Sequence, residues 1–214
     1  MNDSAPLKSI TMSGESNTSE FRQWVREQTL AVATELLLEQ GWDRVRVGQI
    51  AERVGVSRPT IYAEFGNKEG IAESLVFAET QRFLVGIEGR LDQHADDPEK
   101  AVRSAIRYTF READNSPLLR AALTSAGNVN DSILPFLTTR PQPLLFSATE
   151  TLVNWFVEHF PDVVRAPMVD AIDAVVRLVV SNLMFPGEHP RKTPTKVGNV
   201  AVALIEDALL SSSG

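Results

Sequence analysis

The sequence predicts an all-α protein with about nine helices. Apolar residues recur at the three- and four-residue spacing of amphipathic helices along most of the chain, and prolines and glycines separate these stretches. Alternation of apolar and polar residues, which marks a half-buried strand, is never long enough to be convincing, and no internal repeat is evident. The expected helices span residues 20–40, 47–54, 58–65, 68–91, 99–113, 117–123, 144–160, 167–185 and 194–211.

Composition excludes several classes of protein. The 214 residues are enough for one large domain or two modest ones. The absence of cysteine excludes disulfides and thiolate metal sites and favours a cytoplasmic location. Apolar runs are too short to span a membrane, and residues 1–19, rich in Ser, Asn and Thr, are expected to form a flexible tail rather than a signal peptide. No pair of the three histidines has i, i+4 spacing, so we expect no metal site and no cofactor.

The first expected helix, 20–40, is bounded by local signals. Ser19 can cap its first turn, and Gly41 can end it. Trp42 follows that stop, and we expect its large apolar side chain to anchor the core beneath the next two helices.

Two short helical patterns, 47–54 and 58–65, are joined by a Gly-Val-Ser turn. Gly55 falls where a helix ends in a left-handed conformation, which glycine adopts without a Cβ clash. Ser57 can then cap the next helix with its hydroxyl, and Pro59 fits its first turn because no N–H is needed there. This spacing is typical of a helix-turn-helix unit, which presents its second helix to the major groove of DNA. The alternative is an ordinary helical hairpin within an all-α core.

The charge balance does not at first favour a nucleic-acid partner. The formal net charge is −7, from 21 Lys and Arg against 28 Asp and Glu, whereas DNA-binding domains usually carry a basic patch. Binding requires positive charge at the contact surface, however, and not over the whole chain. Four basic residues bracket the two short helices: Arg44, Arg46, Arg58 and Lys68. An acidic remainder would lower non-specific affinity and increase the dependence on specific contacts.

The last two expected helices are apolar over much of their circumference, and a helix of this kind must be buried on more than one side. One side can meet its own domain and the other a second copy of the chain, which predicts a symmetric four-helix interface in a homodimer. The alternative is that both are core helices of a monomer. The residues expected at the interface are Ile172, Val175, Val176, Val179, Leu183, Val200, Leu204 and Ala208.

Residues 22–75 resemble the DNA-binding domain of TetR-family (tetracycline-repressor-like) transcriptional regulators. The matching residues are Gly41-Trp42, Ile50-Ala51, Gly55-Val56-Ser57, Thr60-Ile61-Tyr62, Phe65 and Lys68-Glu69. The resemblance implies a helix-turn-helix DNA-binding domain over 20–67 and an effector-binding and dimerisation domain over 68–214. It also implies a function: a homodimeric, sequence-specific DNA-binding regulator, most often a repressor. Such a protein leaves a palindromic double-stranded DNA operator when a small apolar or amphipathic molecule binds.

Family roles carry over to this chain residue by residue. The residues expected to contact DNA are Arg46, Gly48, Gln49, Arg58, Pro59, Thr60, Tyr62 and Lys68. Arg58 is expected to contact guanine, because the guanidinium fork matches O6 and N7. At Arg46 the chain departs from the family, which usually has Thr or Ser before this helix. Arginine has no acceptor and cannot cap with its side chain, so we expect Arg46 to contact a phosphate instead.

The effector pocket is weakly specified by the sequence. Aromatic and apolar side chains between about residues 99 and 160 could line an apolar cavity, or could equally belong to the core. The pocket candidates are Tyr108, Phe110, Leu123 and Trp155.

Other functional classes stay open as alternatives. A helical enzyme would need a catalytic motif, but the sequence has no G-x-S-x-G elbow, no phosphate-binding glycine loop and no His-Glu metal spacing, so we expect no enzymatic activity. A protein-interaction module would use the hairpin to bind a partner helix and would show no salt-dependent DNA binding. An activator that responds to no small molecule is a variant of the DNA-binding interpretation.

Overall fold

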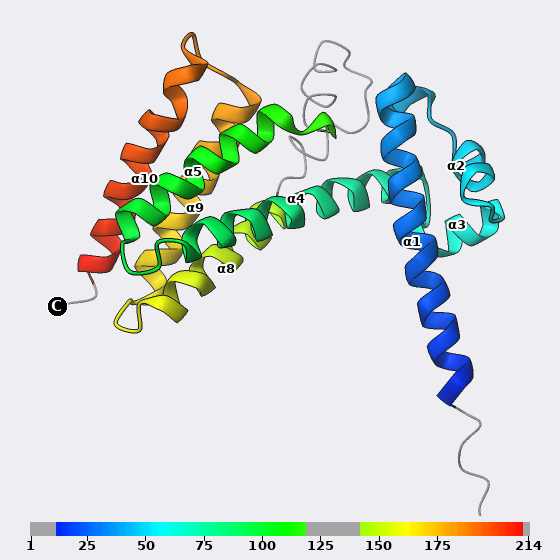
Figure 1. Ribbon diagram of the computed structural model, residues 1–214, viewed down its shortest axis with the longest axis horizontal. Coiled ribbons are helices and arrows are strands. Elements are labelled where there is room, and N and C mark those ends of the chain that lie inside the picture. Colours follow the sequence, from blue (N-terminus) through cyan, green and yellow to red (C-terminus); the bar gives the residue numbers. More distant parts are fainter. Residues whose placement is uncertain (1–11, 119–141, 212–214) are drawn as a thin grey trace, which may run out of the picture. The chain divides into compact units, whose positions relative to one another are not determined.

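The computed structural model of the chain describes residues 12–118 and 142–211. Over these residues the protein has eight α-helices, two short 3-10 helices and no strand, so the all-α prediction is confirmed (Figure 1). The elements are α1 (Met12–Gln40), η1 (Trp42–Arg44), α2 (Val47–Val54), α3 (Arg58–Phe65), α4 (Lys68–Asp92), α5 (Pro98–Asn115), α8 (Gln142–His159), α9 (Arg165–Met184), η3 (Pro190–Lys192) and α10 (Thr193–Leu210). Among the described helices, none combines the length and the hydrophobicity needed to cross a bilayer.

Two expected elements differ from those in the structure. The helix expected over 117–123 is described only at Pro117 and Leu118, which are helical, and its remainder lies outside the described residues. Helix α1 begins at Met12, so residues 12–19, which we expected in a flexible tail, are helical instead. This segment is polar but contains no proline, and polarity alone does not end a helix.

The chain divides into two compact units, Met1–Leu75 and Val76–Gly214. The sequence-based boundary between residues 67 and 68 precedes α4, whereas the structural division falls inside that helix. Ile71, Ala72 and Leu75, in the first two turns of α4, are buried. Burial of these apolar residues ties the start of α4 to the N-terminal unit.

In the N-terminal unit, α2 and α3 bury Val47, Ile50, Ala51, Ile61 and Phe65, and Val54 is half-buried. Trp42 is 0% exposed and anchors this core, as expected. Because both short helices turn their apolar side chains inward, their remaining faces are left at the surface.

The C-terminal unit is built from α5, α8, α9, α10 and the part of α4 from residue 76 onward. Helix α10 packs against both α5 and α9, and α9 packs against α8. Asp97 caps α5 by accepting a hydrogen bond from the Lys100 backbone N–H at 3.0 Å. Trp155 in α8 donates its indole N–H to Asp92 at 2.7 Å, which ties α8 to the end of α4.

Most of the face expected to form the dimer interface lies inside this unit. Five of the eight residues are buried within their own subunit: Ile172, Val175, Val176, Val179 and Ala208. Their side chains are covered by their own subunit, and their place at an interface stays a prediction. The physical reason is that α9 packs against α8 and α10 at once and also lines a cavity, which together use its wide apolar surface. Of the other three, Leu183 and Leu204 are partly buried, and Val200 is 47% exposed.

Candidate nucleic-acid interface and ligand cavity

The turn between α2 and α3 has the geometry that the sequence predicts. Gly55 has a φ of +79°, and its N–H donates to carbonyls in the last turn of α2. Ser57 Oγ accepts a hydrogen bond from the Thr60 N–H at 3.2 Å, and Pro59 lies in the first turn of α3. A left-handed glycine followed at once by a capped helix holds α3 in a defined orientation relative to α2.

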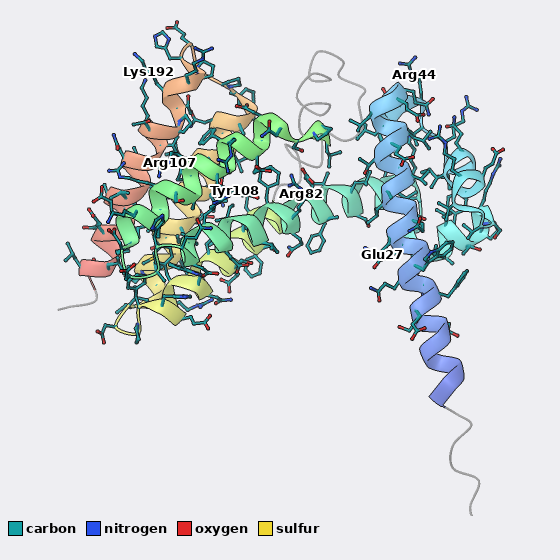
Figure 2. The ribbon with its side chains drawn as sticks, in the orientation of Figure 1. Glu27, Arg44, Arg82, Arg107, Tyr108 and Lys192 are labelled. Atoms are coloured by element: carbon teal, nitrogen blue, oxygen red, sulfur yellow. The ribbon has the colours of Figure 1, made fainter. Side chains whose placement is uncertain are left out.

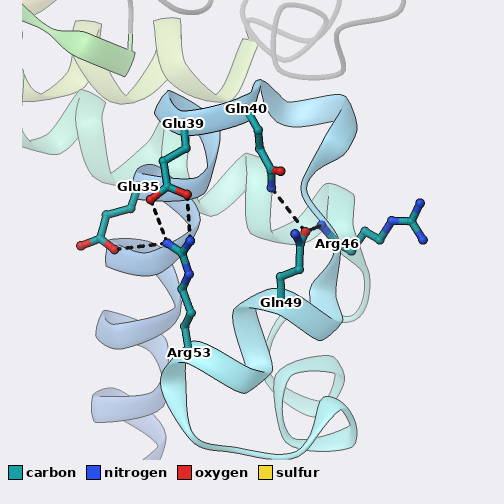
Figure 3. A network of polar contacts seen from close by, with 6 residues as sticks. All are labelled: Glu35, Glu39, Gln40, Arg46, Gln49 and Arg53. Atoms are coloured by element: carbon teal, nitrogen blue, oxygen red, sulfur yellow. Dashed lines mark hydrogen bonds and ion pairs between the residues drawn. The ribbon is translucent and has the colours of Figure 1, made fainter.

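Gln49 caps the start of α2, because Arg46 has no acceptor. Gln49 Oε1 accepts a hydrogen bond from the Arg46 backbone N–H at 2.9 Å and one from Gln40 Nε2 at 3.4 Å (Figure 3). The Arg46 guanidinium is exposed and extends away from this network (Figure 3). The helix start therefore engages the side chain of Gln49, which we expected at the DNA, and leaves the charge of Arg46 at the surface.

Arg58, the first residue of α3, lies against Gly48 in α2. A Cβ placed on Gly48 would lie 2.7 Å from Arg58 Nη2 and 2.9 Å from Arg58 Nε, so the guanidinium occupies the space that a side chain at position 48 would need. Glycine is required there for close approach. Both residues were expected DNA contacts, but the spacing in the sequence could not show that they touch.

The other expected contacts on α3 differ in exposure. Arg58 and Pro59 are exposed, and Tyr62 is 46% exposed. Thr60 is half-buried, and its hydroxyl oxygen lies 2.8 Å from Ser57 Oγ. The N-terminal end of α3 therefore presents a guanidinium, a proline ring and, one turn later, a phenol ring at the surface.

Lys68 is engaged by its own domain. Its Nζ donates to the backbone carbonyls of Trp42 at 2.7 Å and Asp43 at 3.4 Å, and it lies 5.1 Å from the centroid of the Trp42 ring. These contacts hold the segment after α1 against the start of α4. The structure thus gives Lys68 a structural role besides the DNA contact that the resemblance implies.

Several arginines of the N-terminal unit form ion pairs on its surface. Arg22 and Arg26 lie 3.3 and 3.6 Å from the Glu64 carboxylate. Arg53 donates to Glu39 at 2.8 Å (Figure 3), and this hydrogen bond holds the pKa of Glu39 below its usual value. In these pairs the positive charge of the arginines is already matched by glutamates of the same unit.

The arginines next to the short helices are different. Within the part of the chain that the structure describes, no carboxylate lies within 4.0 Å of Arg44, Arg46 or Arg58. The formal charge of −7 therefore coexists with unpaired positive charge at α2 and α3, which is where contact with phosphates and base edges would occur.

A cavity of about 210 Å³ lies within the C-terminal unit. Helices α4, α5, α8 and α9 supply almost all of its wall, and most lining side chains are Val, Leu, Ile, Ala or Phe. Among the lining residues that the structure describes, the polar ones are Glu79, Thr80 and Thr109. Such a wall favours burial of hydrocarbon. In the described ranges, no three His, Asp or Glu side chains gather in a way that could hold a metal ion.

Tyr108, which we expected in the pocket, lies outside its wall. The ring has Arg90 at 5.3 Å and Arg111 at 5.9 Å from its centroid, and the hydroxyl packs closely over Gly86 of α4 (Tyr108 is labelled in Figure 2). Tyr108 therefore packs α5 against α4 instead of facing a ligand.

Phe110 and Trp155 do not line the described cavity either, and the fourth candidate cannot be compared with it. Phe110 is buried in the core, Trp155 is held by its hydrogen bond to Asp92, and Leu123 lies outside the described residues. Three of the four candidates carry large aromatic rings, whereas the described wall is mostly aliphatic. A helical face of smaller side chains on α5 was the signal that could have found it: Val102, Ala105, Ile106 and Thr109.

The Glu79 carboxylate is the centre of a polar cluster beside the cavity. Arg82 Nε and Nη2 donate to it at 3.0 and 2.9 Å, and Ser116 Oγ lies 2.5 Å from Glu79 Oε1 (Arg82 is labelled in Figure 2). Burial raises the pKa of Glu79, but the hydrogen bonds from Arg82 and Ser116 outweigh burial and hold the pKa below its usual value. The carboxylate is therefore ionised at neutral pH.

An exposed helix placed by a left-handed glycine turn, with an unpaired arginine at its start, defines a helix-turn-helix nucleic-acid-binding protein. Comparisons with known proteins agree with this class. The family model for bacterial regulatory proteins of the tetR family matches residues 30–75. The model for the bacterial tetracyclin repressor C-terminal domain matches residues 97–203.

Individual relatives cover most of the chain. The HTH-type transcriptional regulator AlkX of Mycobacterium tuberculosis is 27% identical over 184 residues, which cover 86% of this chain and 84% of the relative. The HTH-type transcriptional regulator EthR of Mycolicibacterium smegmatis is 31% identical over 176 residues, which cover 78% of each chain. The crystal structure of the TetR family repressor AlkX from Dietzia sp. has a TM-score of 0.72 at 23% identity and covers 85% of this chain and 97% of that one. The chain belongs to the TetR family of helix-turn-helix transcriptional regulators.

Proposed function

We propose that this protein is a homodimeric repressor that places one copy of α3 in each of two neighbouring major grooves of a palindromic operator. The observation that carries this proposal is the exposed start of α3, where Arg58 is seated against Gly48 and has no carboxylate partner among the described residues. An arginine contact to guanine O6 and N7 contributes about 1–3 kcal/mol of discrimination. Two-fold symmetry requires half-sites about 34–36 Å apart.

Selection of genomic DNA fragments by the purified protein tests this proposal. The enriched fragments should share a palindrome. Arg58→Ala should weaken binding to that sequence roughly ten- to a hundredfold and relax the preference at one base pair of each half-site. Arg22→Ala is the matched control, because Arg22 is also exposed but is paired with Glu64. Absence of any enriched sequence, or an Arg58 variant that binds as the wild type does, would contradict the proposal.

A small apolar molecule bound in the cavity is proposed to release the operator. Helix α4 supplies lining residues between positions 76 and 91 and begins at Lys68 in the N-terminal unit. A ligand that binds preferentially to one position of α4 can therefore bias DNA affinity, with a typical coupling of about 1–3 kcal/mol. Compounds that raise the Tm should then lower operator affinity in fluorescence anisotropy. Compounds that bind the cavity and leave DNA affinity unchanged would contradict release.

Dimerisation is proposed to use the outer faces of α9 and α10. Small and apolar residues lie exposed or half-buried along them: Ala174, Leu178, Ser181, Val200, Ala203 and Leu204. Small side chains allow the equivalent helices of a second copy to approach closely across a two-fold axis. Ala203→Arg should convert the dimer to a monomer in light scattering, whereas Val85→Arg, an exposed position on α4, should not. A dimer that survives Ala203→Arg would exclude this face.

A further inference from the structure

The two threonines in the cavity wall share one chemical property: they can accept hydrogen bonds but have already donated their proton. Thr80 Oγ1 donates to the Val76 carbonyl at 2.9 Å, and Thr109 Oγ1 donates to the Ala105 carbonyl at 2.9 Å. A hydroxyl in this arrangement keeps only its acceptor lone pairs. A ligand group next to either threonine therefore meets an acceptor.

Glu79 strengthens this acceptor character. Its carboxylate accepts hydrogen bonds from Arg82 and Ser116, and its side chain is 18% exposed. A carboxylate offers about four acceptor sites, so these bonds leave capacity for one more donor. An ionised group beside an apolar wall also repels a second anion, because apolar side chains screen charge less than water does.

The arginine bonded to Glu79 reduces the field of the carboxylate but places no donor in the described wall. Arg82 is not a lining residue, and each of its three nitrogens lies near a carboxylate, with Nε and Nη2 bonded to Glu79 and Nη1 lying 3.5 Å from Glu112. Thr149, whose buried hydroxyl has no hydrogen-bond partner in the described structure, is not a lining residue either. Within the described wall, Glu79 and the two threonines therefore set the polarity of the cavity.

From these contacts we propose that the cavity takes an uncharged hydrocarbon chain ending in a hydroxyl and rejects the corresponding carboxylate. The ligand hydroxyl donates to Glu79 while its chain lies along the aliphatic wall. A carboxylate of the same length would place a second negative charge beside Glu79, with no donor from the described lining side chains to pair with it. This inference rests on the proposed ligand-responsive function and specifies the chemical class of the ligand.

A matched pair of probes, 1-decanol and decanoate, tests the proposal on the full chain. At equal concentration, 1-decanol should raise the Tm of the wild-type protein more than decanoate does. Its Kd from isothermal titration calorimetry should be about tenfold or more lower. Glu79→Gln should shrink this preference severalfold, because it removes the charge and adds a donor amide.

Glu112→Gln is the control variant. It makes the same change of charge and contacts the same arginine, but Glu112 does not line the cavity, so the full preference for 1-decanol should persist. The proposal is overturned if decanoate binds the wild-type protein as tightly as 1-decanol, if neither probe binds, or if Glu79→Gln keeps the full preference. Since the two probes are compared on the wild-type protein, a variant that fails to fold does not remove the test.

DNA release is measured separately, by fluorescence anisotropy on the selected operator. If 1-decanol binds but operator affinity is unchanged, the ligand class stands and the proposed release mechanism fails. If decanoate binds more tightly and releases DNA, the release mechanism stands and the ligand class fails. The two proposals therefore have distinguishable failures.

Discussion

The two units of this protein build their candidate sites in different ways. In the N-terminal unit the candidate DNA contacts lie on two adjacent short helices, just before the first of them and at the start of α4. In the C-terminal unit the cavity wall draws on α4, α5, α8 and α9, which come from well-separated parts of the chain. A site within one continuous segment depends on caps and turns, whereas a cavity depends on how whole helices pack. Substitutions in the two units should therefore have separable effects.

Filling the cavity should have the largest effect, and it tests whether ligand response can be lost without loss of DNA binding. Val176 lines the cavity, so Val176→Phe should abolish the rise in Tm and the loss of DNA affinity caused by 1-decanol. Overpacking typically costs about 1–3 kcal/mol, so the Tm without ligand should fall modestly. Operator affinity without ligand and the dimer should be unchanged in anisotropy and light scattering. A variant that loses the dimer but keeps the ligand response would instead support the interface placement of Val176.

A side chain at position 48 that displaces Arg58 should have the next largest effect on operator affinity. Gly48→Ala would place a Cβ in contact with the guanidinium, and the displaced side chain should lower operator affinity by up to about tenfold. Folding stability should hardly change, because the end of a flexible side chain can move. In an Arg58→Ala background the same substitution should have no further effect, which a double-mutant cycle measures.

Gly89→Ala on α4 is the control for this experiment, because nothing lies within 4 Å of a Cβ at that position. Its operator affinity should match that of the wild type. Additive losses from Gly48→Ala and Arg58→Ala would show that the contact between the two residues does not position the arginine.

Removing the Arg46 side chain should produce a smaller loss of DNA affinity, and the loss should be the same for all DNA sequences. If its exposed guanidinium contacts a phosphate, Arg46→Ala should weaken binding to all sequences equally and reduce the slope of log K against log salt by about one. The Tm should hold, because Gln49 bonds to the backbone of position 46 and not to its side chain. Gln49→Ala, in contrast, should lower the free energy of unfolding by about 1 kcal/mol through loss of the cap. An unchanged salt slope in Arg46→Ala would reject the phosphate contact.

The smallest expected effect is on the acid sensitivity of the C-terminal unit. The pKa of Glu79 is lowered in the folded protein. Its contribution to stability is therefore present above the ordinary glutamate pKa of about 4.3 and is lost as the pH falls through the lower folded-state value. Denaturant unfolding at a series of pH values should show a shallower loss of stability below about pH 5 for Glu79→Gln than for the wild type. Identical pH profiles would mean that Arg82 and Ser116 do not hold the ionised form.

Local signals predicted most helices to within a few residues. The expected span 99–113 compares with α5 at Pro98–Asn115, because a proline and an aspartate cap mark its start. The start of α1 was missed because nothing in residues 12–19 distinguishes a polar helix from a polar tail. The turn residues Gly55 and Ser57 were predicted correctly because each acts on atoms within one helical turn.

The order of amino acids by itself determined where α2 ends, where α3 begins and which residues of α3 point outward, because these depend on backbone conformation and spacing within a short segment. Tertiary structure alone decided what the apolar face of α9 contacts. Helical periodicity defines that Val175, Val176 and Val179 share a face, but a second subunit and a cavity are equally apolar neighbours. It also decided that Arg58 rests on Gly48, since the distance between residues on different helices is set by packing and not by sequence spacing.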